Sequence, residues 1–239
     1  MTLLGACHRG ETKRSSESSP REQPVTQEFL GTPFAVMNTV GLVAFALVGA
    51  TKAIRENFDI FGVTVVGLAT AFAGGMTRDL LVGRVPLALS SPVEIALGVI
   101  GVSLAVVVSA ALESADEHPL TQVSDAIGLA AFTTTGAIVA TQAGIPAFGV
   151  VAIATINAAG GGAVADILLD RSPFILLGDF YASCAVLGGS AYWLVTTVGG
   201  AGGTAAVACA AVVVGTRLAA LVYGWSLPTA RTLGLTHEE

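Results

Sequence analysis

Charge is the scarcest feature of this chain of 239 residues, since Asp, Glu, Lys and Arg together make up only 12% of it. A soluble domain usually carries about 25% charged residues, so this chain has too few charges to cover a surface in water. Hydrophobic residue types make up 53%, and the mean hydropathy is +0.77. The composition argues against a soluble enzyme and a disordered chain, and it indicates an integral membrane protein.

Cysteine, histidine and basic residues are too few or too scattered to build most kinds of reactive or binding site. The spacing of the three cysteines fits neither a disulfide framework nor a zinc site. All three histidines lie in polar segments, and the 11 Lys and Arg residues form no basic patch for nucleic acid. The sequence contains no Ser-His-Asp set, phosphate-binding loop or dinucleotide fingerprint. We therefore expect no enzyme activity, no metal site, no cofactor and no nucleic-acid partner.

Long apolar runs are what the chain has in place of charge. Each run is close to the roughly 20 residues that a helix needs to cross a bilayer, and the runs lack the alternation of barrel strands. The sequence therefore predicts an all-α integral membrane protein with seven transmembrane helices. The expected spans are residues 34–53, 60–83, 92–112, 121–141, 146–169, 178–198 and 203–225.

Two polar tails flank the expected membrane domain of residues 34–225. Residues 1–33 include a Ser-rich stretch of mixed charge, which is typical of a disordered tail. Residues 226–239 are expected to form a short C-terminal tail. The sequence thus predicts one membrane domain between two polar terminal tails.

An internal repeat divides the membrane domain into two units. When the chain is shifted by 87 positions, residues 37–89 align with residues 124–176 without a gap. The matched residues include charges and prolines that biased composition does not explain: Asp79 with Asp166, Arg84 with Arg171, and Pro86 with Pro173. The units cover residues 34–112 and 121–198, and residues 203–225 form a seventh helix. Because each unit has three spans, the second must enter the membrane from the opposite side, which predicts inverted repeats of the kind found in transporters.

Each unit carries a glycine motif in the middle of its second span, at residues 71–86 and 158–173. Consecutive glycines each weaken a helix by about 1 kcal/mol relative to Ala, permit a kink and expose carbonyl groups. The motifs therefore predict a broken helix beside an acidic side chain. The candidate ion-path residues are Thr70, Gly74, Gly75, Arg78 and Asp79 in the first unit, with Asn157, Gly160, Gly161, Gly162 and Asp166 in the second.

A charge within a span costs roughly 2.5–3.5 kcal/mol, so the charged candidates should face protein or water. One interpretation is a hydrated ion path lined by these groups. The other is a structural ion pair, either between Arg78 and Asp79 or between Arg78 and Asp166. Thr70 and Asn157 have two interpretations of the same kind, as polar lining of a path or as helix–helix hydrogen bonds.

Five further polar residues lie within or at the ends of the spans. Asn38 and Asp125 match each other near the starts of spans one and four, where they could cap helices or line a vestibule. Glu94 and Asp179 lie in the first turns of spans three and six, where a helix N-terminus favours anions. For these residues capping is the favoured interpretation. Arg217 in the seventh span is either the partner of an acidic group or a snorkelling side chain. Arg217 and Asp125 are the candidates for a gate or a charge pair.

The paired segments 41–50 with 73–86, and 128–137 with 160–176, resemble the prokaryotic branch of the trimeric intracellular cation (TRIC) channel family. The same sequences are also catalogued as a glycine-transporter-type membrane domain. The resemblance covers residues 34–225. Two departures stand out: Ala73 replaces the first glycine of the first motif, and Ala165 replaces the arginine expected before Asp166. The second departure leaves Asp166 without a neighbouring cationic partner.

The resemblance implies a homotrimer in the cell membrane with one pore inside each multi-pass subunit. It implies seven helices in two inverted repeats, kinked at the glycine motifs of spans two and five. The permeant ions would be K⁺ and, less well excluded, Na⁺. The N-terminus would lie outside and the C-terminus in the cytoplasm. Membrane lipid is the other expected partner.

Three hypotheses for function remain open at this point. The leading one is a passive channel for monovalent cations, gated at the glycine motifs. The alternative is a secondary transporter of glycine or another small solute that uses the same helices as a binding site. A structural membrane scaffold would explain the small residues but would leave the charges within the spans unexplained.

Overall fold

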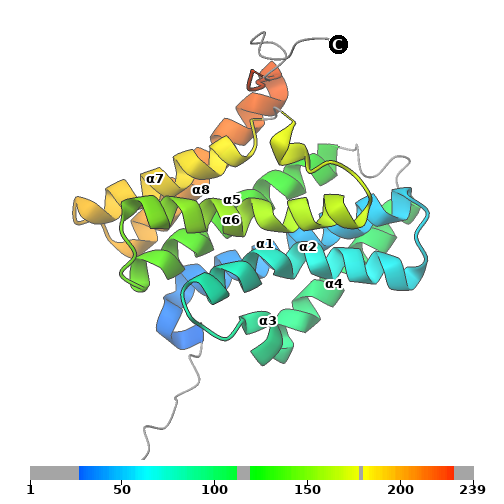
Figure 1. The fold of residues 1–239 in the computed structure, drawn as a ribbon, viewed down its shortest axis with the longest axis horizontal. Coiled ribbons are helices and arrows are strands. Elements are labelled where there is room, and N and C mark those ends of the chain that lie inside the picture. The colour runs from blue at the N-terminus through cyan, green and yellow to red at the C-terminus, as the bar shows by residue number, and fades with distance from the viewer. Residues whose placement is uncertain (1–26, 112–118, 178–179, 229–239) are drawn as a thin grey trace, which may run out of the picture.

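The computed structural model describes residues 27–111, 119–177 and 180–228. Over these residues the fold is a bundle of helices, most of which run along the longest axis of the molecule (Figure 1). In chain order the elements are α1 (Gln27–Arg55), α2 (Ile60–Leu81), α3 (Leu87–Ser90), α4 (Pro92–Ala111), α5 (Pro119–Gln142), α6 (Ala147–Leu168), the 3₁₀ turn η1 (Phe174–Leu176), α7 (Ala182–Thr197) and α8 (Gly202–Tyr223). The all-α prediction is confirmed for this part of the chain.

Six of these helices are long and apolar enough to cross a membrane: α1 from Gly31, α2, α4, α5, α6 and α8. They coincide with expected spans one to five and seven. The expected sixth span corresponds to α7, which has 16 residues and is shorter than the others. A multi-pass membrane protein is therefore the architecture, while the count of seven spans and the inverted repeat remain predictions.

The N-terminal boundary differs from the expected one. Helix α1 begins at Gln27, so residues 27–33 do not belong to a disordered tail. Gly31 interrupts the helix with φ of 78°, a left-handed conformation that glycine adopts without a steric penalty. Pro33 then fits the first turn of the main helix, where its missing N–H is not needed. Residues 1–26 and 229–239, which hold most of both expected tails, lie outside the described residues.

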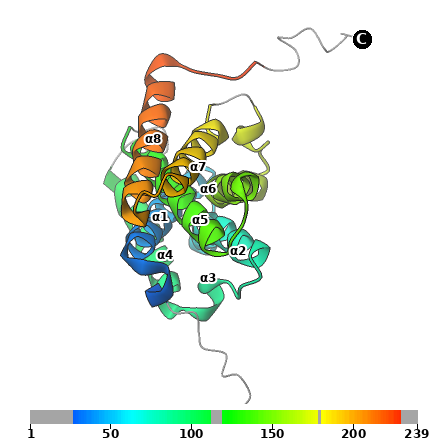
Figure 2. The same cartoon turned by 90° about the vertical axis from the view of Figure 1, so that its left-hand side faces the viewer.

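Helix α5 occupies the middle of the bundle, between α1, α2, α6, α7 and α8 (Figure 2). In its most apolar stretch 78% of the residues are buried, against 28% in α4 and in α8. Three consecutive threonines in this buried stretch donate their hydroxyls to carbonyls of the preceding turn, which satisfies them without a partner helix. The bundle therefore packs around α5, and α1 is its second most buried helix.

The contact between α1 and α5 pairs residues that the repeat aligns. The rings of Phe45 and Phe132 meet edge to face, with centroids 5.0 Å apart. A Cβ atom added at Gly41 would overlap the Phe132 ring, and one added at Gly128 would overlap the Phe45 ring. Each phenylalanine thus fills a space that the absent side chain of the other helix leaves open. Two units related by a two-fold axis would produce this reciprocal packing of each phenylalanine against the glycine of the other helix.

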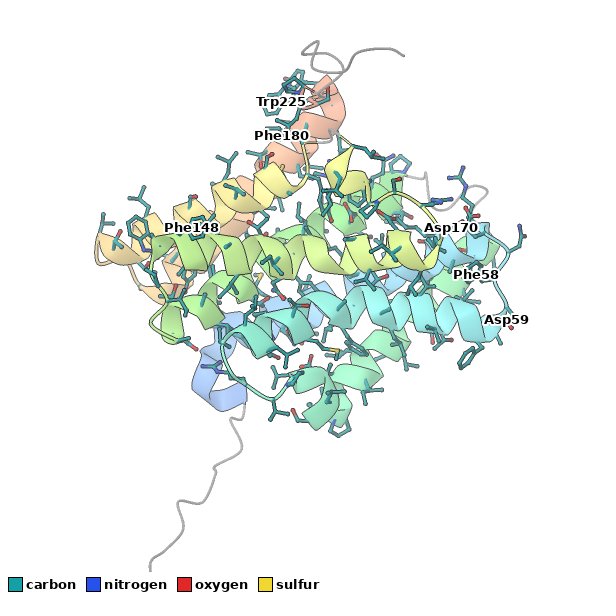
Figure 3. The ribbon with its side chains drawn as sticks, viewed as in Figure 1. Phe58, Asp59, Phe148, Asp170, Phe180 and Trp225 are labelled. Carbon is teal, nitrogen blue, oxygen red and sulfur yellow. The ribbon has the colours of Figure 1, made fainter. Side chains whose placement is uncertain are left out.

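Helices α2 and α6 run in opposite directions. Phe58 and Asp59, just before α2, lie at the same end of the bundle as Asp170, just after α6, whereas Phe148 at the start of α6 lies at the other end (Figure 3). Asp59 caps α2 by accepting a hydrogen bond from the backbone N–H of Gly62 at 2.7 Å. An antiparallel α2 and α6 is the arrangement that inverted units require.

The predicted break at the glycine motifs is wrong. Over Ile60–Leu81 and Ala147–Leu168, all of which the structure describes, α2 and α6 are each one continuous α-helix. Packing against a neighbouring helix outweighs the weak helix propensity of glycine here. The glycines therefore serve close helix packing.

Candidate ion path

The glycine motifs bring α2 and α6 into backbone contact at two points. A Cβ atom added at Gly74 would overlap the carbonyl oxygen of Asn157, and one added at Gly161 would overlap the carbonyl oxygen of Thr70. The two contacts exchange matched residues of the two units, as the antiparallel crossing demands. Small residues allow such an approach between membrane helices.

The other glycines of the motifs are less constrained. A Cβ atom at Gly75 would come no closer than 3.8 Å to a neighbour, and one at Gly160 no closer than 3.5 Å. At Gly162 the nearest neighbour would be the Phe174 ring at 3.3 Å. Each motif thus has one glycine at the crossing itself and one or two beside it.

Thr70 and Asn157 lie at this crossing, but their side chains bond differently. The Thr70 hydroxyl donates to the Val66 carbonyl of its own helix at 2.7 Å. The Asn157 amide donates to the Phe132 carbonyl at 2.5 Å and to the Thr135 hydroxyl at 2.9 Å, which ties α6 to α5. Helix–helix hydrogen bonding is therefore what Asn157 does, while its buried Oδ1 atom has no hydrogen-bond partner among the described residues.

Arg78 and Asp79 form a structural ion pair near the end of α2. Nε and Nη2 of Arg78 both lie 2.8 Å from Oδ1 of Asp79, and the two side chains are only 2% and 4% exposed. The other carboxylate oxygen, Oδ2, accepts the backbone N–H of Leu87 at 3.1 Å. The guanidinium also lies over the Phe34 ring, 5.3 Å from its centroid. The first of the two expected ion pairs is thus the one observed, and Asp166 has a different partner.

Asn38 and Glu94 bind each other beside this pair. The Asn38 amide donates to both carboxylate oxygens of Glu94, at 2.9 and 3.0 Å. Because Asn38 lies well inside α1, the capping interpretation of this residue is wrong. Glu94 does lie in the first turn of α4, but its carboxylate is held by another helix. Together with Phe34, Arg78 and Asp79, these two residues make up what we call the first charge cluster.

A small cavity opens inside the first charge cluster. Its volume is about 10 Å³, roughly the space of one water molecule, and its polar lining comes from Asn38, Arg78, Asp79 and Glu94. The Nη1 atom of Arg78 is buried and has no hydrogen-bond partner among the described residues. A cavity of this size does not test the vestibule interpretation of Asn38, which stays a prediction.

Asp166 is paired with Lys52, which is not among the residues predicted from the sequence to line the ion path. Nζ of Lys52 lies 3.0 Å from Oδ1 of Asp166, and Oδ2 accepts the backbone N–H of Phe174 at 3.0 Å. The ammonium also lies 5.0 Å from the centroid of the Phe174 ring. Ala165 was the available signal, because a missing neighbouring arginine implies that a cation must come from elsewhere in the chain.

Asp125 and Arg217 meet, as expected of a charge pair. Nη2 of Arg217 lies 3.8 Å from Oδ2 of Asp125, and its guanidinium lies over the Tyr181 ring at 4.7 Å. The Tyr181 hydroxyl donates to Oδ1 of Asp125 at 3.0 Å. Asp125 lies inside α5 and does not cap it, so that interpretation is wrong. Lys52 also acts electrostatically on Asp125. We call Lys52, Asp125, Asp166, Phe174, Tyr181 and Arg217 the second charge cluster.

The two charge clusters follow the register of the repeat. Asn38 bonds to Glu94 and Asp125 bonds to Tyr181, and both bonds span 56 positions. Asp79 and Asp166 each accept a backbone N–H from the residue eight positions later. Matched residues therefore make matched bonds, although the cations that neutralise the carboxylates come from unmatched positions.

The clusters lie toward opposite ends of α1. Asn38 and Lys52 are 14 residues apart on this helix (52 − 38 = 14), which corresponds to roughly 20 Å at the usual helical rise. The α2–α6 crossing brings the two motifs together between them. Each end of the bundle thus has one buried carboxylate from a glycine motif, Asp79 at one end and Asp166 at the other.

The two matched arginines of the repeat, Arg84 and Arg171, lie outside the clusters. Arg171 is exposed and pairs with Glu56, while Arg84 is half-buried. The backbone N–H groups of Arg84 and Arg171 close matched turns by donating to the carbonyls of Asp79 and Asp166, both at 2.8 Å. Asp179 lies outside the described residues.

Comparison with known sequences identifies relatives along most of the chain. A family model described as "Glycine transporter" matches two segments, residues 35–111 and 122–197, which begin 87 positions apart (122 − 35 = 87). UPF0126 membrane protein YvgT of Bacillus subtilis is 35% identical over 198 residues, covering 81% of this chain and 94% of the relative. A UPF0126 membrane protein of Deinococcus radiodurans is 35% identical over 161 residues, covering 66% and 74%.

Solved structures with the same fold are channels. One, from a study of conductance through TRIC cation channels, has a TM-score of 0.75 and 31% identity, and the match covers 86% of this chain and 98% of that channel chain. The trimeric intracellular cation channel orthologue of Rhodobacter sphaeroides has a TM-score of 0.72 and 31% identity, covering 81% and 100%. The chain belongs to the TRIC channel family. The segments that the family model matches in this TRIC chain coincide with the two units of the repeat, residues 34–112 and 121–198.

Proposed function

We propose that this TRIC chain is a passive channel for monovalent cations that conducts K⁺ and, less selectively, Na⁺. The path runs inside each subunit along α2 and α6. The observation that carries the proposal is the antiparallel crossing of these helices at Gly74 and Gly161, with the carboxylates of Asp79 and Asp166 toward its two ends. TRIC cation channels with 31% identity share the fold.

The groups along this route suit cations. Carboxylate oxygens and backbone carbonyl oxygens can both replace part of the hydration shell of a monovalent cation. The carbonyls of Thr70 and Asn157 already point at the glycines of the facing helix. A small separation of α2 from α6 would expose these oxygens to an ion.

The crossing itself is the proposed gate. With Gly74 against Asn157 and Gly161 against Thr70, the helices touch backbone to backbone and leave no room for an ion. Glycine contacts carry no interlocked side chains, so the helices can separate there without repacking a core. Gating would then be a movement of two continuous helices rather than the straightening of broken ones.

The fixed cations near the route are compatible with cation flow because each is neutralised. Arg78 is bound by Asp79, and Lys52 is bound by Asp166. Arg217 lies within ion-pair distance of Asp125. An unpaired cation in the path would repel K⁺, whereas a paired one leaves the local charge near zero.

The proposed assembly is a homotrimer in a lipid membrane, with seven spans in two inverted repeats. An odd number of crossings places the two termini on opposite sides of the membrane, and we propose that the N-terminus lies outside and the C-terminus in the cytoplasm. Lys52, Arg55 and Arg171 then face the cytoplasm, which agrees with the positive-inside tendency. The name of the Rhodobacter sphaeroides orthologue describes a trimer, which supports the same assembly here.

A second candidate function is secondary transport of glycine or another small solute. It is favoured by the description of the family model that matches both units. In this case the space between α2 and α6 would be a binding site that opens to one side at a time.

Flux into liposomes separates the two candidates. With purified protein in KCl-loaded vesicles, a channel should give an electrogenic K⁺ flux that follows the membrane potential. This flux should not depend on the concentration of glycine. Asp79→Asn and Asp166→Asn should change the rate or the preference for K⁺ over Na⁺. Electrically silent vesicles that show saturable glycine counterflow would instead establish the transporter.

A further inference from the structure

The Lys52–Asp166 pair differs from the Arg78–Asp79 pair in where its cation comes from. Arg78 is the chain neighbour of Asp79 and its side chain is 2% exposed. Lys52 comes from α1, a different helix from that of Asp166, and its side chain is 22% exposed. Lys52 is therefore a cation on a flexible stem that can leave its carboxylate for water.

The surroundings of Asp166 are suited to hold a monovalent cation. Its Oδ2 atom is fixed by the backbone N–H of Phe174, which leaves Oδ1 to face the ammonium at 3.0 Å. The face of the Phe174 ring lies on the same ammonium at 5.0 Å and attracts positive charge. A carboxylate oxygen and an aromatic face would receive K⁺ in the same way, because both ions carry one charge and are of similar size.

We propose that Lys52 is a tethered cation that competes with permeant monovalent cations for Asp166 and thereby holds this end of the path closed. The proposal rests on the proposed channel function. While the ammonium occupies Asp166, α1 is joined to the end of α6 and the entrance carries no net charge. When K⁺ takes its place, Lys52 moves into water and α6 is free to separate from its neighbours.

A second ion pair strengthens the same closure. Glu56, one helical turn after Lys52, pairs with Arg171, which follows the end of α6. The side chains of this pair are 36% and 39% exposed, so salt screens it. At the opposite end, the cation that neutralises Asp79 is Arg78 of the same helix, so this ion pair does not join two helices. Control by K⁺ should therefore act from one side only.

Single-channel recording in planar bilayers tests this proposal. Lys52→Met removes the charge and keeps most of the stem, and we expect it to raise the open probability at least about fivefold. Lys52→Arg keeps the charge and should restore the low open probability. In a chain that already carries Asp166→Asn, Lys52→Met should cause no further rise in open probability, since the carboxylate for which Lys52 competes is gone. Glu56→Gln breaks the second, solvent-screened ion pair of the closure and should raise the open probability less than Lys52→Met does.

The wild-type chain gives a test that needs no variant. Raising K⁺ about tenfold on the side of Lys52 should raise the open probability, and the same change on the opposite side should not. If Lys52→Met only lowers the thermal stability, and both sides respond alike to K⁺, the proposal is wrong although the channel function stands. A wild-type chain that passes no current at all contradicts both.

Discussion

At the scale of single residues, burial decides how much each charge pair matters. Arg78 and Asp79 are almost fully buried, whereas Glu56 and Arg171 are exposed. Two charges taken out of water repay the cost of desolvation only while both are present. The buried pair is therefore a structural requirement, and the exposed one contributes little to stability.

Asp79→Asn should lower the stability of the folded chain strongly, because it leaves the Arg78 guanidinium buried without a counter-charge. We expect a loss of about 3–5 kcal/mol, compared with less than about 1 kcal/mol for Glu56→Gln. Denaturant unfolding in detergent, followed by tryptophan fluorescence, measures both. Equal losses for the two variants would show that the Arg78–Asp79 pair is more hydrated than the structure indicates.

Single-residue roles could be predicted only where the partner is close in the sequence. The Arg78–Asp79 pair joins chain neighbours and was predicted as one of two alternatives. The Lys52–Asp166 pair spans 114 positions, and periodicity carries no information about which helices meet at that distance. The capping interpretation of Asn38 failed for a related reason, since its partner Glu94 lies on another helix.

At the scale of the helix, the glycine motifs act through contact rather than through flexibility. The sequence predicts where they are and that they matter, but a weak helix propensity has two structural outcomes. In isolation it favours a break, and in a bundle it allows a neighbour to approach. The second outcome holds for α2 and α6 because each glycine at the crossing faces a backbone carbonyl.

Gly74→Ala and Gly161→Ala should each disturb the crossing, since the added methyl group would overlap a carbonyl oxygen that cannot move without its helix. We expect each to cost about 1–3 kcal/mol, as overpacking does. Gly75→Ala and Gly160→Ala are matched controls from the same motifs, because their added Cβ atoms meet only ordinary contacts. Higher helix propensity should leave these controls neutral or slightly more stable.

Thermal unfolding in detergent compares the four variants directly. We expect two groups, with lower unfolding temperatures for Gly74→Ala and Gly161→Ala than for the two control variants. If all four variants behave alike, the helices do not meet at these glycines in the folded protein.

At the scale of the whole molecule, the repeat carries most of the predictable information. Helix positions follow from the apolar runs, and the shift by 87 positions predicts which contacts recur, such as Phe45 against Phe132. Three features lie beyond it: the shortness of α7, the early start of α1 at Gln27, and the cations that differ between the units.

The difference between the units has a consequence for function. Both carboxylates of the motifs are neutralised, but one by a neighbour in its own helix and the other by a lysine from α1. A symmetric path would respond equally to ions from both sides. The two ends of this one differ in how readily the local cation can be displaced.

The central claim is that each subunit conducts monovalent cations along α2 and α6, and reversal potentials in planar bilayers test it most directly. Purified wild-type protein between unequal KCl solutions should give currents that reverse near the K⁺ equilibrium potential. With KCl opposite NaCl, the reversal potential should show a modest preference for K⁺. The double variant Asp79→Asn with Asp166→Asn should move the KCl reversal potential toward zero. Absence of current from intact trimers, or reversal near the Cl⁻ equilibrium potential, would contradict the account.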